Sequence, residues 1–270
     1  MQTRLEQILE YKRNEVEQRK LNVTVEALKA KIESLGRPRN FFAAVTRKTP
    51  GKRMNLIAEI KKASPSAGVI RDDFDPVKIA AAYEAAGADA ISVLTDEPSF
   101  QGKLEYIDLV RSAVKLPVLR KDFLIDPYQV YESRAAGADA ILLIAECLRT
   151  DEMIDLQILA TELNLTCLIE VHDMDNLMRV RDHVIGFPHR SYSLLGINNR
   201  DLRTFKTDLG TTMRMADLVA DKDVLVSESG INDQDDVRKL ANEGVRAALV
   251  GESLMRADDV RAKIRDMFFE

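Results

Sequence analysis

Hydrophobic and polar positions follow two different patterns along the chain. Before residue 55, apolar residues recur every three or four positions, first over residues 5–16 and again over 25–35. This spacing predicts two amphipathic helices, with Thr24 as the N-cap of the second. Gly36 and Pro38 end the second helix, and a short helical stretch is expected over 41–45.

After residue 54 the pattern changes to short apolar runs separated by amphipathic segments. The runs cover residues 56–61, 90–95, 117–123, 140–146, 166–172, 194–199, 224–229 and 247–251. Strands that alternate with helices in this way predict an α/β fold, and eight of them predict a closed parallel (β/α)8 TIM barrel. An open doubly wound sheet is the alternative.

An internal repeat supports this interpretation. Residues 85–95 read AAGADAISVLT, residues 135–145 read AAGADAILLIA, and a weaker echo lies at 243–253. Each copy combines a helix end, a glycine and a buried strand, as expected of repeated strand and helix units. We therefore expect one domain over residues 1–270, with a helical extension over 1–54 and the barrel over 55–270. The extension either covers one end of the barrel or also contributes to a lid over the substrate.

Composition and charge narrow the class of protein. With 270 residues, of which 46% are hydrophobic, the chain is long enough for one large domain. The net charge is −5 and the basic residues are interspersed with acids, so we expect no nucleic-acid partner. No run approaches the ~20 apolar residues that cross a bilayer, and the start of the chain does not resemble a signal peptide, so we expect no membrane association.

The cysteines and histidines do not form a recognisable metal or disulfide pattern. Cys147 and Cys167 both lie in apolar runs, where buried free thiols are common, and this favours the reducing cytoplasm as the compartment. His172, His183 and His189 lack the spacing of paired ligands, so we expect no metal site. The sequence leaves open whether the chain is a monomer or a weak homodimer.

Polar residues gather at the ends of the predicted strands. The carboxyl ends of barrel strands form the open rim where substrates bind. Residues at or near these ends are Glu59, Lys61, Lys121, Glu146, Glu170, Asn198, Glu228 and Ser229. Because alternate residues of a strand share a face, Lys121, Glu170 and Glu228 are expected to point inward above an apolar layer. Isolated ion pairs at a solvated rim are the alternative, but two lysines and three glutamates that converge in a partly dry cavity suit proton transfer.

Glycines follow the last two predicted strands, in SESGI at 227–231 and in LVGESLM at 249–255. Glycine lets backbone N–H groups approach an anion without obstruction by a Cβ atom, and many barrels bind phosphate at this place. Lys61 can reach the same anion from the first strand, and the loop that contains Ser64 can close above it. The sequence thus predicts a small anionic ligand near Gly230 and Gly251.

Several motifs, in this order, resemble the indole-3-glycerol phosphate synthase family: IAEIKKASPSAG, AISVLTDEPSFQG, PVLRKDFLIDPYQVYESRAAGADAILLI, LIEVH, GINNRDL, VSESGI and VGESLM. The resemblance covers essentially the whole chain. It implies a carboxy-lyase of tryptophan biosynthesis with a phosphosugar substrate, 1-(2-carboxyphenylamino)-1-deoxyribulose 5-phosphate. The family closes the second ring of this substrate and removes carbon dioxide and water.

The family's catalytic positions fall on residues already singled out by their places at strand ends. The resemblance implies a catalytic set of Glu59, Lys61, Lys121, Glu170, Asn198, Glu228 and Ser229. It implies a substrate-binding and phosphate-binding set of Lys61, Ser64, Phe100, Arg200, Gly230, Gly251 and Glu252. Glu252 stands where many members have serine, so its backbone amide is the expected contact. Residues 186–192 look like an insertion that affects stability or association more than catalysis.

The family's chemistry also implies roles for these residues. Lys121 is expected to act as the general acid that protonates the substrate ketone, and Glu170 to act as acid or base in dehydration. Glu59 or Lys61 handles the remaining proton, and Arg200 meets the substrate carboxylate. No metal or organic cofactor is expected, because the substrate supplies its own electron sink.

Two other functions stay open. A phosphoribosyl anthranilate isomerase is also a phosphosugar barrel, but it releases no carbon dioxide. A non-catalytic phosphosugar sensor or assembly subunit would keep the anion site without the proton-transfer groups. The presence of Lys121 together with Glu170 favours the synthase.

Overall fold

The computed structural model describes residues 3–184, 193–201 and 206–270. It begins with three helices, α1 (Arg4–Asn22), α2 (Val25–Ser34) and α3 (Phe41–Thr46). These confirm the helices predicted before residue 55, although α1 continues further than expected. None of the described helices is both long and apolar enough to span a lipid bilayer. The expected insertion at 186–192 lies outside the described residues.

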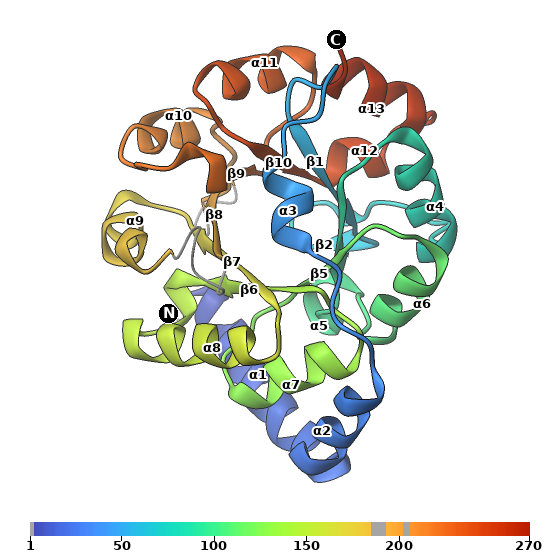
Figure 1. The fold of residues 1–270 in the computed structure, drawn as a ribbon, viewed down its shortest axis with the longest axis vertical. Coiled ribbons are helices and arrows are strands. Elements are labelled where there is room, and N and C mark those ends of the chain that lie inside the picture. The colour runs from blue at the N-terminus through green and yellow to red at the C-terminus, as the bar shows by residue number, and fades with distance from the viewer. Residues whose placement is uncertain (1–2, 185–192, 202–205) are drawn as a thin grey trace.

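Eight parallel strands form a closed barrel (Figure 1). They are β1 (Asn55–Ile60), β4 (Ala90–Leu94), β5 (Val118–Lys121), β6 (Ala140–Ile144), β7 (Thr166–Val171), β8 (Ser193–Asn198), β9 (Leu225–Glu228) and β10 (Ala247–Val250). The strands follow one another around the barrel in chain order, and β1 closes it by pairing with both β10 and β4. The predicted (β/α)8 TIM barrel is confirmed, and the open doubly wound sheet is excluded.

An outer ring of helices covers the barrel (Figure 1). The main helices are α4 (Pro76–Ala86), α6 (Glu105–Ala113), α7 (Pro127–Ala135), α8 (Thr150–Glu162), α9 (Met174–Val180), α10 (Gly210–Ala216), α11 (Gln234–Asn242) and α13 (Val260–Phe268). Shorter elements are β2 (Ala63–Ser64), β3 (Gly68–Val69), α5 (Glu97–Phe100), α12 (Glu252–Met255) and the 3₁₀ turns η1 (Ala145–Cys147), η2 (Arg181–His183) and η3 (Lys222–Val224).

Aspartates set the points at which several outer helices begin. Asp75, Asp126, Asp173 and Asp233 precede α4, α7, α9 and α11, and each side chain accepts a hydrogen bond from a backbone N–H of the first turn. Such a cap satisfies an N–H group that has no partner within the helix and contributes about 1 kcal/mol. The caps therefore limit the length of the loops that leave the strand ends.

Side chains of the strands alternate between two apolar layers. One layer lies between the strands and the outer helices, and the other lies inside the barrel. The inner layer includes Leu119, Leu168 and Val226, each two positions before a predicted site residue. The inward direction predicted from strand alternation is therefore confirmed.

The N-terminal helices contact both ends of the barrel. Phe41 and Val45 of α3 are fully buried in the inner layer, and Asn55 Nδ2, at the start of β1, donates to the carbonyl of Val45 at 2.6 Å. Helix α3 thus closes the amino-terminal end of the barrel, across the centre of the view in Figure 1. Helix α1 instead inserts its fully buried Lys12 beside Asp122, just after β5. Helix α3 therefore covers one end of the barrel, and helix α1 reaches the other end.

Six of the eight predicted strands are shorter in the structure, and two of the shorter ends move residues that the sequence analysis placed on strands. Strand β6 ends at Ile144 because the chain turns into η1, so Glu146 and Cys147 lie in that turn rather than on the strand. Strand β9 ends at Glu228, and Ser229 follows it with a φ of +65°. Both ends are places where the backbone leaves the sheet to form the rim of the barrel.

Candidate active site

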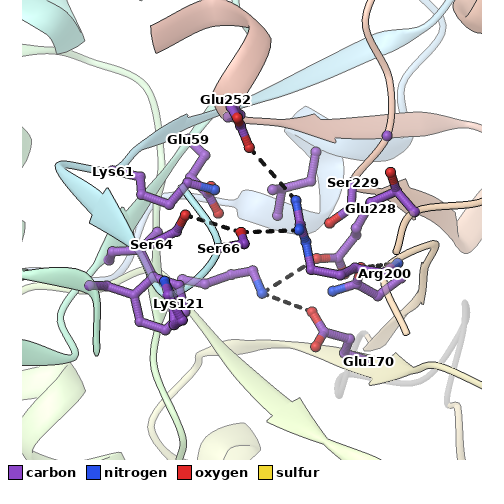
Figure 2. Close-up of a pocket in the computed structure, with 18 of the residues that line it drawn as sticks. Glu59, Lys61, Ser64, Ser66, Lys121, Glu170, Arg200, Glu228, Ser229 and Glu252 are labelled. Carbon is purple, nitrogen blue, oxygen red and sulfur yellow. Dashed lines mark hydrogen bonds and ion pairs between the residues drawn. The ribbon is translucent and has the colours of Figure 1, made fainter. Parts of the chain in front are cut away.

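A cavity of about 390 Å³ opens at the carboxyl ends of the barrel strands. The structure places every predicted site residue on its walls: Glu59, Lys61, Ser64, Phe100, Lys121, Glu170, Asn198, Arg200, Glu228, Ser229, Gly230, Gly251 and Glu252. Figure 2 shows several of them pointing toward one another from different strands and loops. The fold thus brings together residues that are far apart in the sequence.

Lys121 is a cation near the centre of this cavity. Its Nζ lies 2.8 Å from Glu170 Oε2 and 3.5 Å from Glu228 Oε2 (Figure 2). Burial alone would lower the pKa of Lys121, but the charges of Glu170, Glu228 and Glu59 outweigh burial and raise that pKa above its ordinary value. Lys121 is therefore protonated at neutral pH and can donate a proton to a substrate oxygen.

The two glutamates beside Lys121 differ in protonation. Burial would raise the pKa of Glu170, but the charges of Lys121 and His172 lower it below its usual value. Burial and the charge of Glu170 raise the pKa of Glu228 well above its usual value. An ionised Glu228 would have no hydrogen-bond partner for either oxygen among the described residues, whereas a protonated Glu228 can donate to Glu170. The site therefore combines an ionised carboxylate with a neutral carboxylic acid.

A second lysine and glutamate pair lies at the end of β1. Lys61 Nζ is 2.6 Å from Glu59 Oε1, which confirms that the two side chains share a face. A Cβ atom on Gly251 would collide with the Glu59 carboxylate, and a Cβ atom on Gly196 would collide with that of Glu228. These two glycines therefore leave the space that the buried carboxylates occupy.

Arg200 extends across the cavity from the end of β8 (Figure 2). Its Nη1 donates to Ser66 Oγ at 3.2 Å, and its Nη2 lies 3.7 Å from Glu252 Oε2. Its backbone N–H donates to Asn198 Oδ1 at 3.0 Å, and Ser66 Oγ lies 3.4 Å from Ser64 Oγ. The guanidinium thus lies between the loop after β1 and the start of α12, where the sequence predicts an anion.

The backbone after β9 turns sharply at the cavity wall. Ser229 and Gly230 have φ angles of +65° and +72°, and both line the cavity. This conformation is costly for serine and is held by its surroundings. Asn199 Nδ2 donates to the carbonyls of Glu228 and Ser229, at 3.0 Å in each case. The side chain of Asn199 therefore fixes the turn that brings Ser229 and Gly230 to the cavity.

Part of the cavity wall is apolar. The rings of Phe100 and Phe123 lie 6.5 Å apart between centroids, and both residues line the cavity. Leu5 and Ile8 of α1 line it as well. Aromatic and aliphatic side chains of this kind provide a surface for an aromatic part of a ligand.

Sequence reasoning did not place three residues in or beside the site: His172, its partner Glu146 and Arg4. His172 lines the cavity, and its Nε2 lies 3.4 Å from Glu170 Oε1. Its Nδ1 lies 3.1 Å from Glu146 Oε2. The sequence analysis places Glu146 at a strand end but not in the site. Strand alternation contained the signal, because His172 lies two positions after Glu170 and shares its face. Arg4 of α1 also lines the cavity, but only the docking of that helix places it there.

The arrangement supplies charges and proton-transfer groups. In the part of the chain that the structure describes, no cluster of three or more His, Cys, Asp or Glu side chains is placed to hold a metal ion. Lys121 and Glu170 can donate and accept protons, and Lys61 and Arg200 provide positive charge for an anionic ligand. The cavity thus suits acid and base chemistry on an anionic substrate.

Comparison with known proteins identifies the family. The sequence profile described as "Indole-3-glycerol phosphate synthase" matches residues 5–267. A relative of that name from Geobacillus kaustophilus is 50% identical over 98% of this chain and 97% of its own, and one from Rhodopirellula baltica is 54% identical over 77% and 78%. The solved structure of 3-hexulose-6-phosphate synthase from Salmonella typhimurium shares the fold, with a TM-score of 0.61 and 16% identity over 79% of this chain and 96% of that one. The chain therefore belongs to the indole-3-glycerol phosphate synthase family.

Proposed function

We propose that this chain catalyses the indole-3-glycerol phosphate synthase reaction of tryptophan biosynthesis. In this reaction 1-(2-carboxyphenylamino)-1-deoxyribulose 5-phosphate closes its second ring and loses carbon dioxide and water. The contact of 2.8 Å between Lys121 Nζ and Glu170 Oε2, inside a cavity that also contains Lys61 and Gly251, carries the proposal. A proton donor and a proton acceptor thus lie beside a place for phosphate.

We assign the two ends of the substrate to different walls. Lys61, Ser64 and the backbone at Gly230, Gly251 and Glu252 hold the phosphate, as the glycines and the nearby cation support. The aromatic ring lies against Phe100. Arg200 binds an anionic group of the substrate, for which the carboxylate is our assignment. The sugar hydroxyls contact Asn198, Glu228 and Ser229.

Ring closure is the step assigned to Lys121. The ring carbon that bears the carboxylate attacks the ketone carbon, and the ketone oxygen takes the proton of Lys121. Because neighbouring glutamates raise the pKa of Lys121, the lysine keeps its proton until the oxygen becomes strongly basic in the transition state. The step leaves a cationic iminium on the substrate.

Decarboxylation and dehydration follow. The electron pair of the bond to the carboxylate flows into the iminium, and the aromatic ring is restored as carbon dioxide leaves. Dehydration needs a proton for the departing hydroxyl and a base for a carbon-bound proton. We assign the base to Glu170, which is ionised in the resting site, and the donor to Lys61 or Glu59. The whole reaction takes up one proton, because the substrate carboxylate leaves as neutral carbon dioxide.

The setting of the reaction follows from the same chemistry. The substrate's iminium is the electron sink, so the proposal includes no metal or organic cofactor.

We further infer that residues 1–54 and 55–270 form one domain, as the buried Lys12 and Phe41 of the extension support. The enzyme is proposed to act in the cytoplasm, as a monomer or a weak homodimer, and the free thiols of Cys147 and Cys167 support a reducing compartment.

One assay tests this function against the two alternatives. The full chain is incubated with the carboxyphenylamino substrate, and indole fluorescence and carbon dioxide are measured together. The chain contains no tryptophan, so its own fluorescence in this range is small. The proposal predicts both products in equal amounts. In a parallel incubation with phosphoribosyl anthranilate, turnover without carbon dioxide would favour the isomerase. Binding of the carboxyphenylamino substrate without turnover would favour the sensor.

A further inference from the structure

His172 is a buried titratable residue that the mechanism above does not use. It follows the last residue of β7 and lines the cavity. We propose that His172, held by Glu146, is a positioning residue that keeps the Glu170 carboxylate in place and ionised. This inference rests on the proposed function, because Glu170 is the base assigned there.

Each ring nitrogen of His172 faces a different carboxylate. Nδ1 lies 3.1 Å from Glu146 Oε2, and Nε2 lies 3.4 Å from Glu170 Oε1. The backbone N–H of His172 also donates to Glu146 Oε1, at 2.9 Å. A neutral imidazole has one donor nitrogen, whereas an imidazolium has two. The charged form therefore donates a hydrogen bond from Nδ1 to Glu146 and places a positive charge at ion-pair distance from Glu170.

The turn that carries Glu146 is itself anchored. Glu146 lies in η1, and Arg179 of α9 donates hydrogen bonds to the carbonyls of Ala145 and Leu148 on either side of it. The Glu146 carboxylate contacts both the backbone N–H and the ring Nδ1 of His172. Glu146 thus holds the imidazole from the side away from Glu170. Nε2 has no hydrogen-bond partner among the described residues and lies at ion-pair distance, 3.4 Å, from Glu170 Oε1.

The charges around His172 come from three elements. Glu146 and Cys147 lie in η1, Glu170 lies on β7, and Lys121 lies at the end of β5. Burial disfavours the imidazolium, but the hydrogen bond to Glu146 and the charge of Glu170 outweigh burial and Lys121, so the pKa of His172 is raised. Burial raises the pKa of the Cys147 thiol, which stays neutral. In return, the charge of His172 is one of the causes that lower the pKa of Glu170.

Nuclear magnetic resonance tests the arrangement without substrate. The imidazole signals of the full chain are titrated, and the signal of His172 is identified by its absence in His172→Gln. We expect His172 to remain protonated above the ordinary histidine pKa of about 6.5, and Glu146→Gln to bring its titration to lower pH. Titration of His172 at or below that ordinary value, or no change in Glu146→Gln, would overturn the proposal.

Steady-state kinetics tests the consequence for catalysis. We expect His172→Gln to lower kcat about tenfold, because the Glu170 carboxylate is no longer held in its productive position, with KM changed less than about twofold. Loss of the positive charge raises the pKa of Glu170, so the acid limb of the kcat profile moves to higher pH. Glu146→Gln should act in the same direction and more weakly, and it keeps the histidine if His172→Gln fails to fold. His183→Gln is the matched control and should match the wild type.

A double variant separates positioning from a purely structural role. If His172 acts through Glu170, then His172→Gln lowers the residual kcat of Glu170→Gln by less than about twofold. A tenfold loss in that background, or a loss with an unchanged pH profile, would mean that His172 only supports the fold. Failure of the wild-type chain to turn over its substrate would count against the proposed function alone, since the resonance titration still decides the state of His172.

Discussion

Two clusters of buried charge lie on opposite faces of β5. The site cluster consists of Glu59, Lys61, Lys121, Glu170 and Glu228, and the interface cluster consists of Lys12, Asp96, Arg120, Asp122 and Glu132. Residues 120, 121 and 122 are consecutive, but strand alternation directs Lys121 into the cavity and its two neighbours toward α1 and α7. Asp96 and Asp122 also line the cavity wall, so the two clusters adjoin there. Similar residue types therefore enter two different environments.

The clusters differ in how completely their polar atoms are paired. Arg120 donates to Glu132 at 2.8 Å, to Asp122 at 3.0 Å and to Thr95 at 3.1 Å. Lys12 Nζ lies 3.0 Å from Asp96 and 2.8 Å from Asp122. In the site cluster, by contrast, neither oxygen of Glu228 accepts a hydrogen bond from a described residue, and Lys121 Nζ comes no closer than 3.5 Å to Oε2. The neutral Glu228 is paired only through the proton that it can donate to Glu170.

This difference separates structural charge from functional charge. A buried ion pair stabilises a particular packing only when all its donors and acceptors are satisfied, and the interface cluster meets that condition where α1 docks. Acceptors left without partners cost free energy unless a ligand supplies the missing groups. The incomplete pairing of the site cluster is therefore what we expect of residues whose remaining hydrogen-bond partners are supplied by a bound substrate.

The largest expected effect is on activity, from Lys121→Met. Removing the general acid should lower turnover by about 100-fold to 10,000-fold, the usual contribution of general acid catalysis. The measurement is steady-state indole fluorescence, with circular dichroism to check the fold. Lys103→Met, which alters an exposed lysine paired with Glu105, is the control and should retain wild-type turnover. A loss much smaller than tenfold would contradict the role of Lys121.

Lys12→Met should give the opposite result, with a large effect on stability and a small one on kcat. The change leaves Asp96 and Asp122 buried without their cation, which should lower the free energy of unfolding by about 3 to 5 kcal/mol. Urea denaturation measures this loss. Lys20→Met removes a partly exposed pair with Asp126 and should cost less than about 1 kcal/mol. If Lys12→Met lowered kcat as far as Lys121→Met, the two clusters would not be separable.

The sequence contained enough information for the barrel and for most of the site. Runs of strand length at regular intervals specify the strands, and alternation along each strand specifies which side chains point inward. Glu170 and Lys121 were predicted to meet for this reason, and they do. These predictions depend only on local periodicity and on the known position of substrate sites in barrels.

Contacts that depend on docking could not be predicted in the same way. Lys12 falls in the apolar stripe of α1, but its partners Asp96 and Asp122 lie far along the chain, and only the docked helix brings them together. Glu146 meets His172 because β6 ends early and turns into η1. A turn of this kind leaves no periodic signal in the sequence.

Glu228→Gln tests the protonation state of the site cluster and should have a moderate effect. The pKa of Glu228 is raised by burial and by Glu170, so the folded state binds this proton more tightly than the unfolded state does. The free energy of unfolding of the wild type should then fall as pH rises above the unfolded value of about 4.3, with a slope of at most about 1.4 kcal/mol per pH unit for this group. Glutamine carries no such proton. The free energy of unfolding of the variant should therefore increase relative to that of the wild type as the pH rises.

Urea denaturation at several pH values between about 5 and 8 measures the difference in free energy of unfolding between Glu228→Gln and the wild type. Glu105→Gln, which alters an exposed carboxylate outside the cavity, serves as the matched control for the substitution itself. A pH-independent gap for Glu228→Gln would mean that Glu228 is ionised in the folded protein. The site cluster would then contain two adjacent charges of the same sign.

The smallest expected effect comes from Tyr11→Phe in α1. The Tyr11 hydroxyl donates to Asp96 Oδ1 at 2.7 Å, and Lys12 Nζ remains 3.0 Å from the same oxygen when the hydroxyl is lost. The free energy of unfolding should fall by about 1 kcal/mol, the usual net value of one hydrogen bond. Because the substitution leaves Lys12 in place to hold α1, kcat and KM should stay within about twofold of the wild type. A larger change in kcat than in stability would show that the pairing of the interface cluster controls the site cluster, and that the two faces of β5 act together.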